Sequence, residues 1–159
     1  MNGYLMQEQS FVRGEDNFIE SFSPENKYGT IFEDDGETAY FYAVERDAEG
    51  QGLKVLDALH IYEADEPGEV DGNRLDEAGE VDGNKADGVA GGAGKKTSKL
   101  IIVWSKDWKK CALVIDGYCH AIFDFEAQSG YNINEFPPPN SIWTKGERKM
   151  TGELIKKLF

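Results

Sequence analysis

The stretch from Lys99 to Phe125, KLIIVWSKDWKKCALVIDGYCHAIFDF, predicts three consecutive antiparallel strands at the centre of the fold. Two apolar runs, Leu100–Trp104 and Cys111–Ile115, flank a polar turn, and a third run begins at Tyr118. Asp116-Gly117 separates the second run from the third. An Asp-Gly pair between apolar runs is a strong hairpin signal, because a type I′ turn needs positive φ at both central residues. The rest of the chain is arranged around this meander.

The Asp116-Gly117 turn predicts a register that pairs Val114 with Cys119 and Cys111 with Ile122. Successive side chains of a strand alternate between its faces, so the only two cysteines of the chain then point to opposite faces. Opposite faces cannot be bridged without rebuilding the backbone. We therefore expect two free, buried thiols and a reducing, cytoplasmic location.

Size and charge limit the function classes. A chain of 159 residues with 40% hydrophobic content is long enough for a substantial core, so we expect residues 1–159 to form a single domain. The formal net charge of −13 disfavours nucleic acid and anionic membranes and favours a basic protein or a cation, with plain solubility as the alternative. We expect no signal peptide at the N-terminus, and no apolar run reaches the ~18 residues that span a membrane.

A second hairpin is predicted between residues 28 and 44. Its tip is the acidic sequence Asp34-Asp35-Gly36-Glu37, and a turn at Asp35-Gly36 would place Phe32 opposite Ala39. Both faces of the second strand of this hairpin carry bulky residues. That pattern indicates a central strand, or a strand with one face covered by a helix or a ligand.

Two further segments have regular patterns. The segment 53–62, LKVLDALHIY, is short, ends in β-forming residues and lies among hairpins, which favours a strand, with a helix as the alternative. Residues 150–159 predict a short helix with Thr151 as its N-cap. Its apolar face comprises Leu154, Ile155, Leu158 and Phe159.

Residues 64–97 differ sharply in composition from the rest. They are rich in Gly and Asp and contain a tandem repeat, DEPGEVDGNRL followed by DEAGEVDGNKA. Such a segment cannot bury enough apolar surface to offset its ordering entropy, so we expect a flexible acidic insertion. An EF-hand frame that starts at Asp82 places Ala86 at position 5, where a ligand is needed, so we expect no metal site.

The acidic hairpin tip is the strongest candidate for contact with a basic partner, although solvated charges at such tips are ordinary. A tryptophan in the polar turn SKDWKK is hard to bury from there, and tryptophans are common interface anchors. The candidate contact residues are Glu33, Asp34, Asp35, Glu37 and Trp108.

A ligand pocket on one face of the sheet is the second candidate site. Tyr118, His120 and Asp124 alternate along one predicted strand, together with Leu113 and Ile122 on the same face, and a His–Asp pair can act in acid–base chemistry. Structural roles for the histidine and for Cys111 are the alternative. No GxSxG, P-loop, GxGxxG, HExxH or CxxC motif occurs, so we expect no cofactor and no enzymatic activity.

Six fragments carry a family resemblance. They are FEDDGETAYFYA (32–43), LDALHIY (56–62), IIVWS (101–105), ALVIDGYCHAIFDF (112–125), GY (130–131) and FPPPNSIW (136–143). Together they resemble a family of small bacterial proteins described as a domain of unknown function, over residues 25–145 apart from the insertion. The resemblance implies a bacterial cytoplasmic domain and carries no catalytic residues.

These observations predict an α+β fold: an antiparallel sheet of about five to seven strands, built of hairpins in a meander, with one short C-terminal helix. We expect a non-enzymatic protein that binds another protein, in its concrete form an immunity-type inhibitor of a bacterial toxin. Acidic inhibitors use their field to attract and block basic enzymes. The alternative is a small-ligand-binding or enzymatic domain with its pocket on one sheet face.

Overall fold

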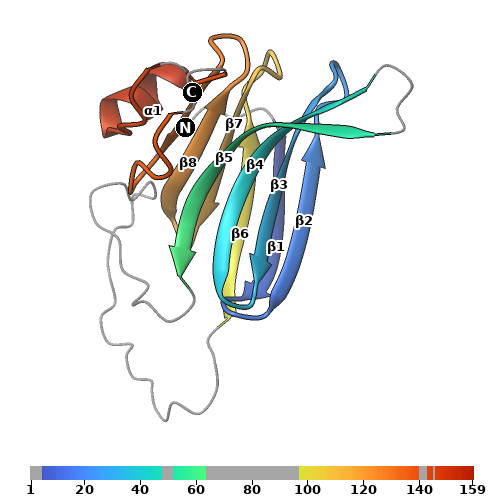
Figure 1. Cartoon of the computed structure of the whole chain (residues 1–159), viewed down its shortest axis with the longest axis vertical. Coiled ribbons are helices and arrows are strands. Elements are labelled where there is room, and N and C mark those ends of the chain that lie inside the picture. Colours follow the sequence, from blue (N-terminus) through green and yellow to red (C-terminus); the bar gives the residue numbers. More distant parts are fainter. Residues whose placement is uncertain (1–4, 48–51, 64–96, 140–142, 145) are drawn as a thin grey trace.

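The computed structural model describes residues 5–47, 52–63, 97–139, 143–144 and 146–159. These residues form nine strands in two antiparallel sheets and one short helix (Figure 1). The predicted class, antiparallel β structure with a C-terminal helix, is confirmed. The described residues contain more strands than expected, because residues 5–12 and 16–22, which lack a clean alternation, also form strands.

One sheet contains five strands in the order β1-β6-β7-β8-β9. Its strands are β1 (Leu5–Val12), β6 (Thr97–Trp104), β7 (Lys110–Ile115), β8 (Tyr118–Asp124) and β9 (Ser129–Asn132). The predicted meander forms its centre, and β1 pairs with the outer edge of β6.

The other sheet contains four strands in sequence order. They are β2 (Asp16–Phe22), β3 (Tyr28–Asp35), β4 (Thr38–Arg46) and β5 (Leu53–Glu63). The strand interpretation of residues 53–62 is therefore confirmed. Each strand pairs with its neighbour through a hairpin, which is the simplest antiparallel topology.

The main core lies between the two sheets. Phe41 of the four-stranded sheet stacks on Phe123 of the five-stranded sheet, with ring centroids 5.4 Å apart. The buried indole of Trp104 donates a hydrogen bond of 3.0 Å to Ser21 Oγ in the opposite sheet. This bond satisfies a polar group that would otherwise be costly to bury, and it fixes how the sheets face each other.

A second, smaller core lies on the outer face of the five-stranded sheet. Helix α1 (Gly152–Leu158) packs there and buries Ile155 against a cluster that includes Ala112, Val114 and Cys119. Thr151 caps the helix as predicted, because its Oγ1 accepts a hydrogen bond from the Leu154 amide at 3.1 Å. Figure 1 shows α1 beside β8, away from β2 and β3.

The central turn has the predicted geometry, with φ of 50° at Asp116 and 87° at Gly117. Val114 pairs with Cys119 as expected, but Cys111 pairs with Phe123 and not with Ile122. The cause is a register shift between Leu113 and Val114, which leaves His120 as an extra residue in β8. Both cysteines are nevertheless free, buried and on opposite faces, as predicted.

The second hairpin has a wider loop than expected. Asp34 pairs with Ala39, so Phe32 lies opposite Phe41 and the prediction of a Phe32–Ala39 pair is wrong. Asp35 Oδ1 accepts hydrogen bonds from the amides of Glu37 and Thr38 and stabilises the wider turn. The shift is two residues, so each side chain remains on its predicted face.

A buried ion pair ties the C-terminal part of the chain to β5. Both Nη atoms of Arg148 bind the carboxylate of Asp57, at 2.8 and 2.9 Å, and Thr144 Oγ1 donates to the same carboxylate at 2.6 Å. Arg148 also binds the carbonyl oxygens of Gly130 and Pro137. A Cβ at Gly130 would lie 2.9 Å from Asp57 Oδ2, so the glycine permits this close approach.

The predicted insertion, residues 64–97, lies outside the described residues except for Thr97, which begins β6. The single-domain assignment of residues 1–159 stays a prediction. Within the part of the chain that the structure describes, no helix has the length and apolar character needed to cross a membrane.

Candidate binding surface

The outer face of the four-stranded sheet combines acidic and aromatic side chains in three neighbouring cross-strand rows. The first row holds Asp16, Asp35, Thr38 and Glu63, the second Phe18, Glu33, Tyr40 and His60, and the third Glu20, Ile31, Tyr42 and Ala58. None of these positions is Lys or Arg. We call this surface, defined by the three rows, the acidic–aromatic face.

Aromatic rings form a contiguous strip across this face. Tyr40 and Tyr42 stack at 6.0 Å, and Tyr40 meets His60 edge to face at 5.4 Å. The His60 ring in turn lies 6.0 Å from the ring of Phe136, which is 50% exposed. Phe18, which Glu33 separates from Tyr40 in the second row, is 59% exposed. Exposed, adjoining aromatic rings are typical of interaction surfaces.

Two carboxylates of the face are held by hydrogen bonds to these rings. Tyr42 donates to Glu33 Oε1 at 3.3 Å, and His60 Nε2 lies 2.8 Å from Glu63 Oε2. Burial raises the pKa of Tyr42, and the charge and hydrogen bond of Glu33 raise it further. The phenol therefore stays protonated and acts as a donor that orients Glu33.

The sequence prediction for the hairpin tip is only partly matched by the geometry. Asp35 and Glu37 are exposed, and Glu33 is half-buried on the acidic–aromatic face. Asp34 is 1% exposed, so the prediction that it contacts a partner is wrong. Its carboxylate accepts hydrogen bonds from the Gly14 amide at 2.8 Å and from the Tyr62 hydroxyl, which joins two turns at one end of the molecule.

Trp108 is not available to a partner either. It is 8% exposed and packs against Trp104 in the main core, with ring centroids 5.7 Å apart. Its φ of 59° places the backbone in the left-handed region, and its ring lies in the core although the turn itself is polar. The expectation of an exposed tryptophan is therefore wrong.

The predicted pocket of Tyr118, His120 and Asp124 does not form. Tyr118 and Asp124 are the two ends of β8, about 20 Å apart at the usual rise per strand residue. His120 is buried, and its Nδ1 lies 3.0 Å from the Tyr118 carbonyl oxygen. Asp124 accepts hydrogen bonds from the amides of residues 126 and 127. His120 and Asp124 are therefore engaged in contacts within the fold, and Tyr118 lies at the far end of the strand from Asp124.

The register shift also separates the residues that were predicted to share a face with His120. Leu113 belongs to the main core between the sheets, whereas Ile122 belongs to the cluster under α1. The shift at His120 reverses the alternation along β8, and no local sequence signal marks it.

Burial makes the candidate catalytic groups unreactive. It lowers the pKa of His120 to about 4, so the imidazole is neutral near pH 7. It raises the pKa of the Cys119 thiol to about 12 and also raises that of Cys111, so neither forms a thiolate nucleophile. Among the described residues, no three His, Cys, Asp or Glu side chains group as metal ligands would.

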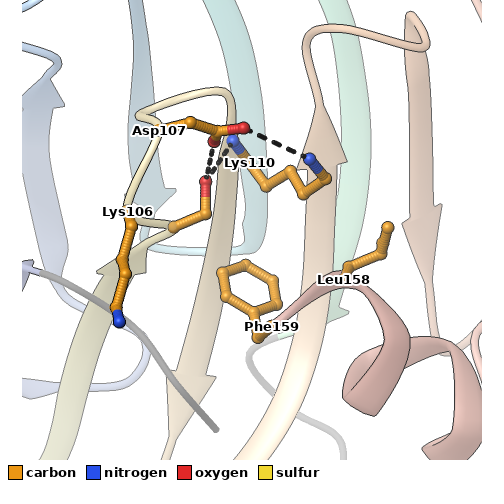
Figure 2. Close-up of a pocket in the computed structure, with 6 residues that line it drawn as sticks. Lys106, Asp107, Lys110, Leu158 and Phe159 are labelled. Carbon is orange, nitrogen blue, oxygen red and sulfur yellow. Dashed lines mark hydrogen bonds and ion pairs between the residues drawn. The ribbon is translucent and has the colours of Figure 1, made fainter.

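A surface cavity of about 340 Å³ lies between the β6–β7 turn and the end of α1 (Figure 2). Its polar wall is already paired, because Asp107 lies 2.6 Å from Ser105 Oγ and 3.8 Å from Lys110 Nζ. Lys106 points away from this pair in Figure 2. Leu158 and Phe159 form the apolar wall. The residues predicted to line a pocket contribute none of its lining.

The sequence reasoning missed most of the acidic–aromatic face. Its signal was present in the bulky side chains on both faces of residues 38–44, where Tyr40 and Tyr42 alternate with the core residues Phe41 and Ala43. Phe18 gave no such signal, because the alternation around it is irregular.

Fold and surface together define an acidic two-sheet β protein in which α1 packs on the outer face of one sheet and the outer face of the other carries the acidic–aromatic rows. The family model described as "Uncharacterized protein conserved in bacteria (DUF2251)" matches residues 11–78 and 85–159. The chain therefore belongs to this bacterial family, which confirms the resemblance and extends it into the acidic segment.

A Haemophilus influenzae protein described as uncharacterized is 34% identical over 122 residues. The match covers 76% of this chain and 60% of that protein, so the chain spans about 60% of its relative's length. No solved structure matches the chain significantly.

Proposed function

We propose that this protein is a non-enzymatic binder of a basic protein, and in its concrete form an immunity-type inhibitor of a bacterial toxin. The observation that carries the proposal is the acidic–aromatic face. Five of its twelve positions are Asp or Glu and none is Lys or Arg. Such a surface attracts cationic partners over distances of about a Debye length and then offers them aromatic area to bury.

The state of the candidate catalytic groups supports binding over catalysis. His120 and both thiols are buried and held in their neutral forms. Exposed carboxylates on and beside the face, such as Asp35 and Glu37, attract a cation. We place the protein in the cytoplasm, where two free cysteines are stable as thiols.

The test is binding between the full chain and the protein encoded by the adjacent gene, at low and at moderate salt. We expect binding that weakens as salt rises, and restored growth when the two are produced together. The double variant D35N/E37Q should bind more weakly. The matched control E147Q/E153Q makes the same charge change at exposed residues near α1 and should bind as the parent does.

Either of two results would overturn the proposal. One is a neighbouring protein that is not basic or that does not bind at low salt. The other is unchanged toxicity of that protein when this chain is present in excess.

A further inference from the structure

We propose that the acidic–aromatic face receives an arginine side chain of the partner, stacked on Tyr40 and Tyr42 and paired with Glu33. This inference rests on the proposed function and names the chemistry of the contact. The occupant is a cationic segment of a basic protein, since the face carries no cation of its own on its three rows.

Contacts between a guanidinium group and an aromatic ring already occur within the fold. The Arg13 guanidinium lies 4.1 Å from the ring centroid of Tyr62, and that of Arg46 lies 4.6 Å from the ring of Phe22. The Lys27 ammonium is farther from its ring, at 5.9 Å from Tyr28. Among these three contacts of the described residues, the two guanidinium groups lie closer to their rings than the ammonium does.

Tyr40 and Tyr42 also present aromatic rings, but among the described contacts neither ring has a cation over it. Their rings are nearly parallel, with an interplanar angle of 16°, and both are half-exposed. A partly exposed ring face of this kind suits a planar guanidinium better than a compact ammonium.

Glu33 supplies the countercharge at the right place. It is the cross-strand partner of Tyr40, and its Oε1 is held by the Tyr42 hydroxyl at 3.3 Å. That bond orients the carboxylate, and its second oxygen is available to a guanidinium N–H. Charge-assisted bonds of this kind add directional specificity to the stacking. Glu63 is less suited, because both of its oxygens already have partners.

The experiment titrates the full chain with a capped peptide of three arginines spaced by glycines and with its lysine counterpart. Binding is followed by NMR through the ring resonances of Tyr40 and Tyr42. We expect shifts of these resonances and an affinity for the arginine peptide at least about threefold higher than for the lysine peptide.

Two variants separate the proposed contact from general attraction. Glu33→Gln keeps the shape of the side chain and removes its charge, and should weaken binding of the arginine peptide about fivefold. Glu25→Gln makes the same charge change at an exposed turn between β2 and β3 and should change the affinity by less than about twofold. A Tyr42→Phe variant should show an intermediate loss, since it keeps the ring and releases Glu33.

Equal weakening by Glu33→Gln and Glu25→Gln, equal affinity for the two peptides, or unmoved tyrosine resonances would overturn the contact. Failure here is distinct from failure of the proposed function. If the adjacent basic protein binds the Glu33→Gln variant as tightly as the parent, the arginine contact is wrong while partner binding stands.

Discussion

The two sheets differ in what covers their outer faces. The five-stranded sheet presents Ala112, Val114 and Cys119, and α1 buries them. The four-stranded sheet presents carboxylates and rings, and Phe18 remains 59% exposed there. The outer face of the five-stranded sheet packs against another part of the same chain. The outer face of the four-stranded sheet has the polar and aromatic composition of a surface that contacts solvent or a charged partner.

This difference separates residues that stabilise the fold from residues that are free to bind. Substitutions on the covered side should lower the free energy of unfolding, because they remove buried contacts. Substitutions on the acidic–aromatic face should leave that free energy nearly unchanged and alter binding.

The largest effect is expected from Arg148, whose ion pair with Asp57 anchors the segment that leads to α1. Arg148→Ala leaves a buried, uncompensated carboxylate and should lower the free energy of unfolding by about 3–5 kcal/mol. Urea unfolding followed by tryptophan fluorescence measures the loss. Lys149→Ala, at the exposed neighbouring residue, is the control and should cost less than about 0.5 kcal/mol. Comparable losses in the two variants would show that the ion pair does not anchor this segment.

A direct comparison of the two faces comes next. Ile155 is 3% exposed on the face of α1 that packs against the sheet, and changing it to Ala should cost about 2–4 kcal/mol. Phe18→Ala removes a larger side chain from the acidic–aromatic face and should cost under about 1 kcal/mol. Both are measured by thermal and urea unfolding. A larger loss for Phe18→Ala than for Ile155→Ala would contradict the division between covered and uncovered faces.

Local signals account for the part of the fold that was predicted. Asp116-Gly117 specifies its turn because both residues must adopt positive φ, and both do. Thr151 caps its helix through a bond to a residue three positions on. The two-sheet arrangement was not predicted, since it depends on which faces meet across the core, and Trp104 and Ser21 are far apart in sequence.

The candidate site was harder to predict for the same reason. Glu33, Asp35 and Glu37 are accessible, as expected, but the neighbouring Asp34 is used by the distant Gly14 and Tyr62. Nothing local distinguishes a carboxylate that holds two turns together from one that faces solvent. Trp108 shows the opposite error. It lies in a polar turn and was expected to be exposed, but its side chain is buried in the core.

A buried histidine in β8 should also make stability depend on pH. Burial lowers the pKa of His120 to about 4 in the folded protein, below the value of about 6.5 for an unfolded chain. The unfolded state therefore binds more protons between these values, so stability is full above pH 6.5 and falls as the pH drops towards 4. We expect a loss of about 2 kcal/mol between pH 7 and pH 5. Unfolding of the parent and of His120→Gln at both pH values measures it, and an equal loss in the variant would contradict the assignment.

The smallest effect on stability is expected on the acidic–aromatic face itself. Glu20 is exposed in the third row, so Glu20→Gln should change the free energy of unfolding by less than about 0.5 kcal/mol. Removing one carboxylate from a face without cations should nevertheless weaken a basic partner and flatten the salt dependence of its binding, because fewer charges are screened. Binding to the adjacent basic protein across a salt series, with Glu153→Gln as the control near α1, measures this. If Glu20→Gln and Glu153→Gln lower the affinity equally, the partner responds to the net charge of the chain and not to this face.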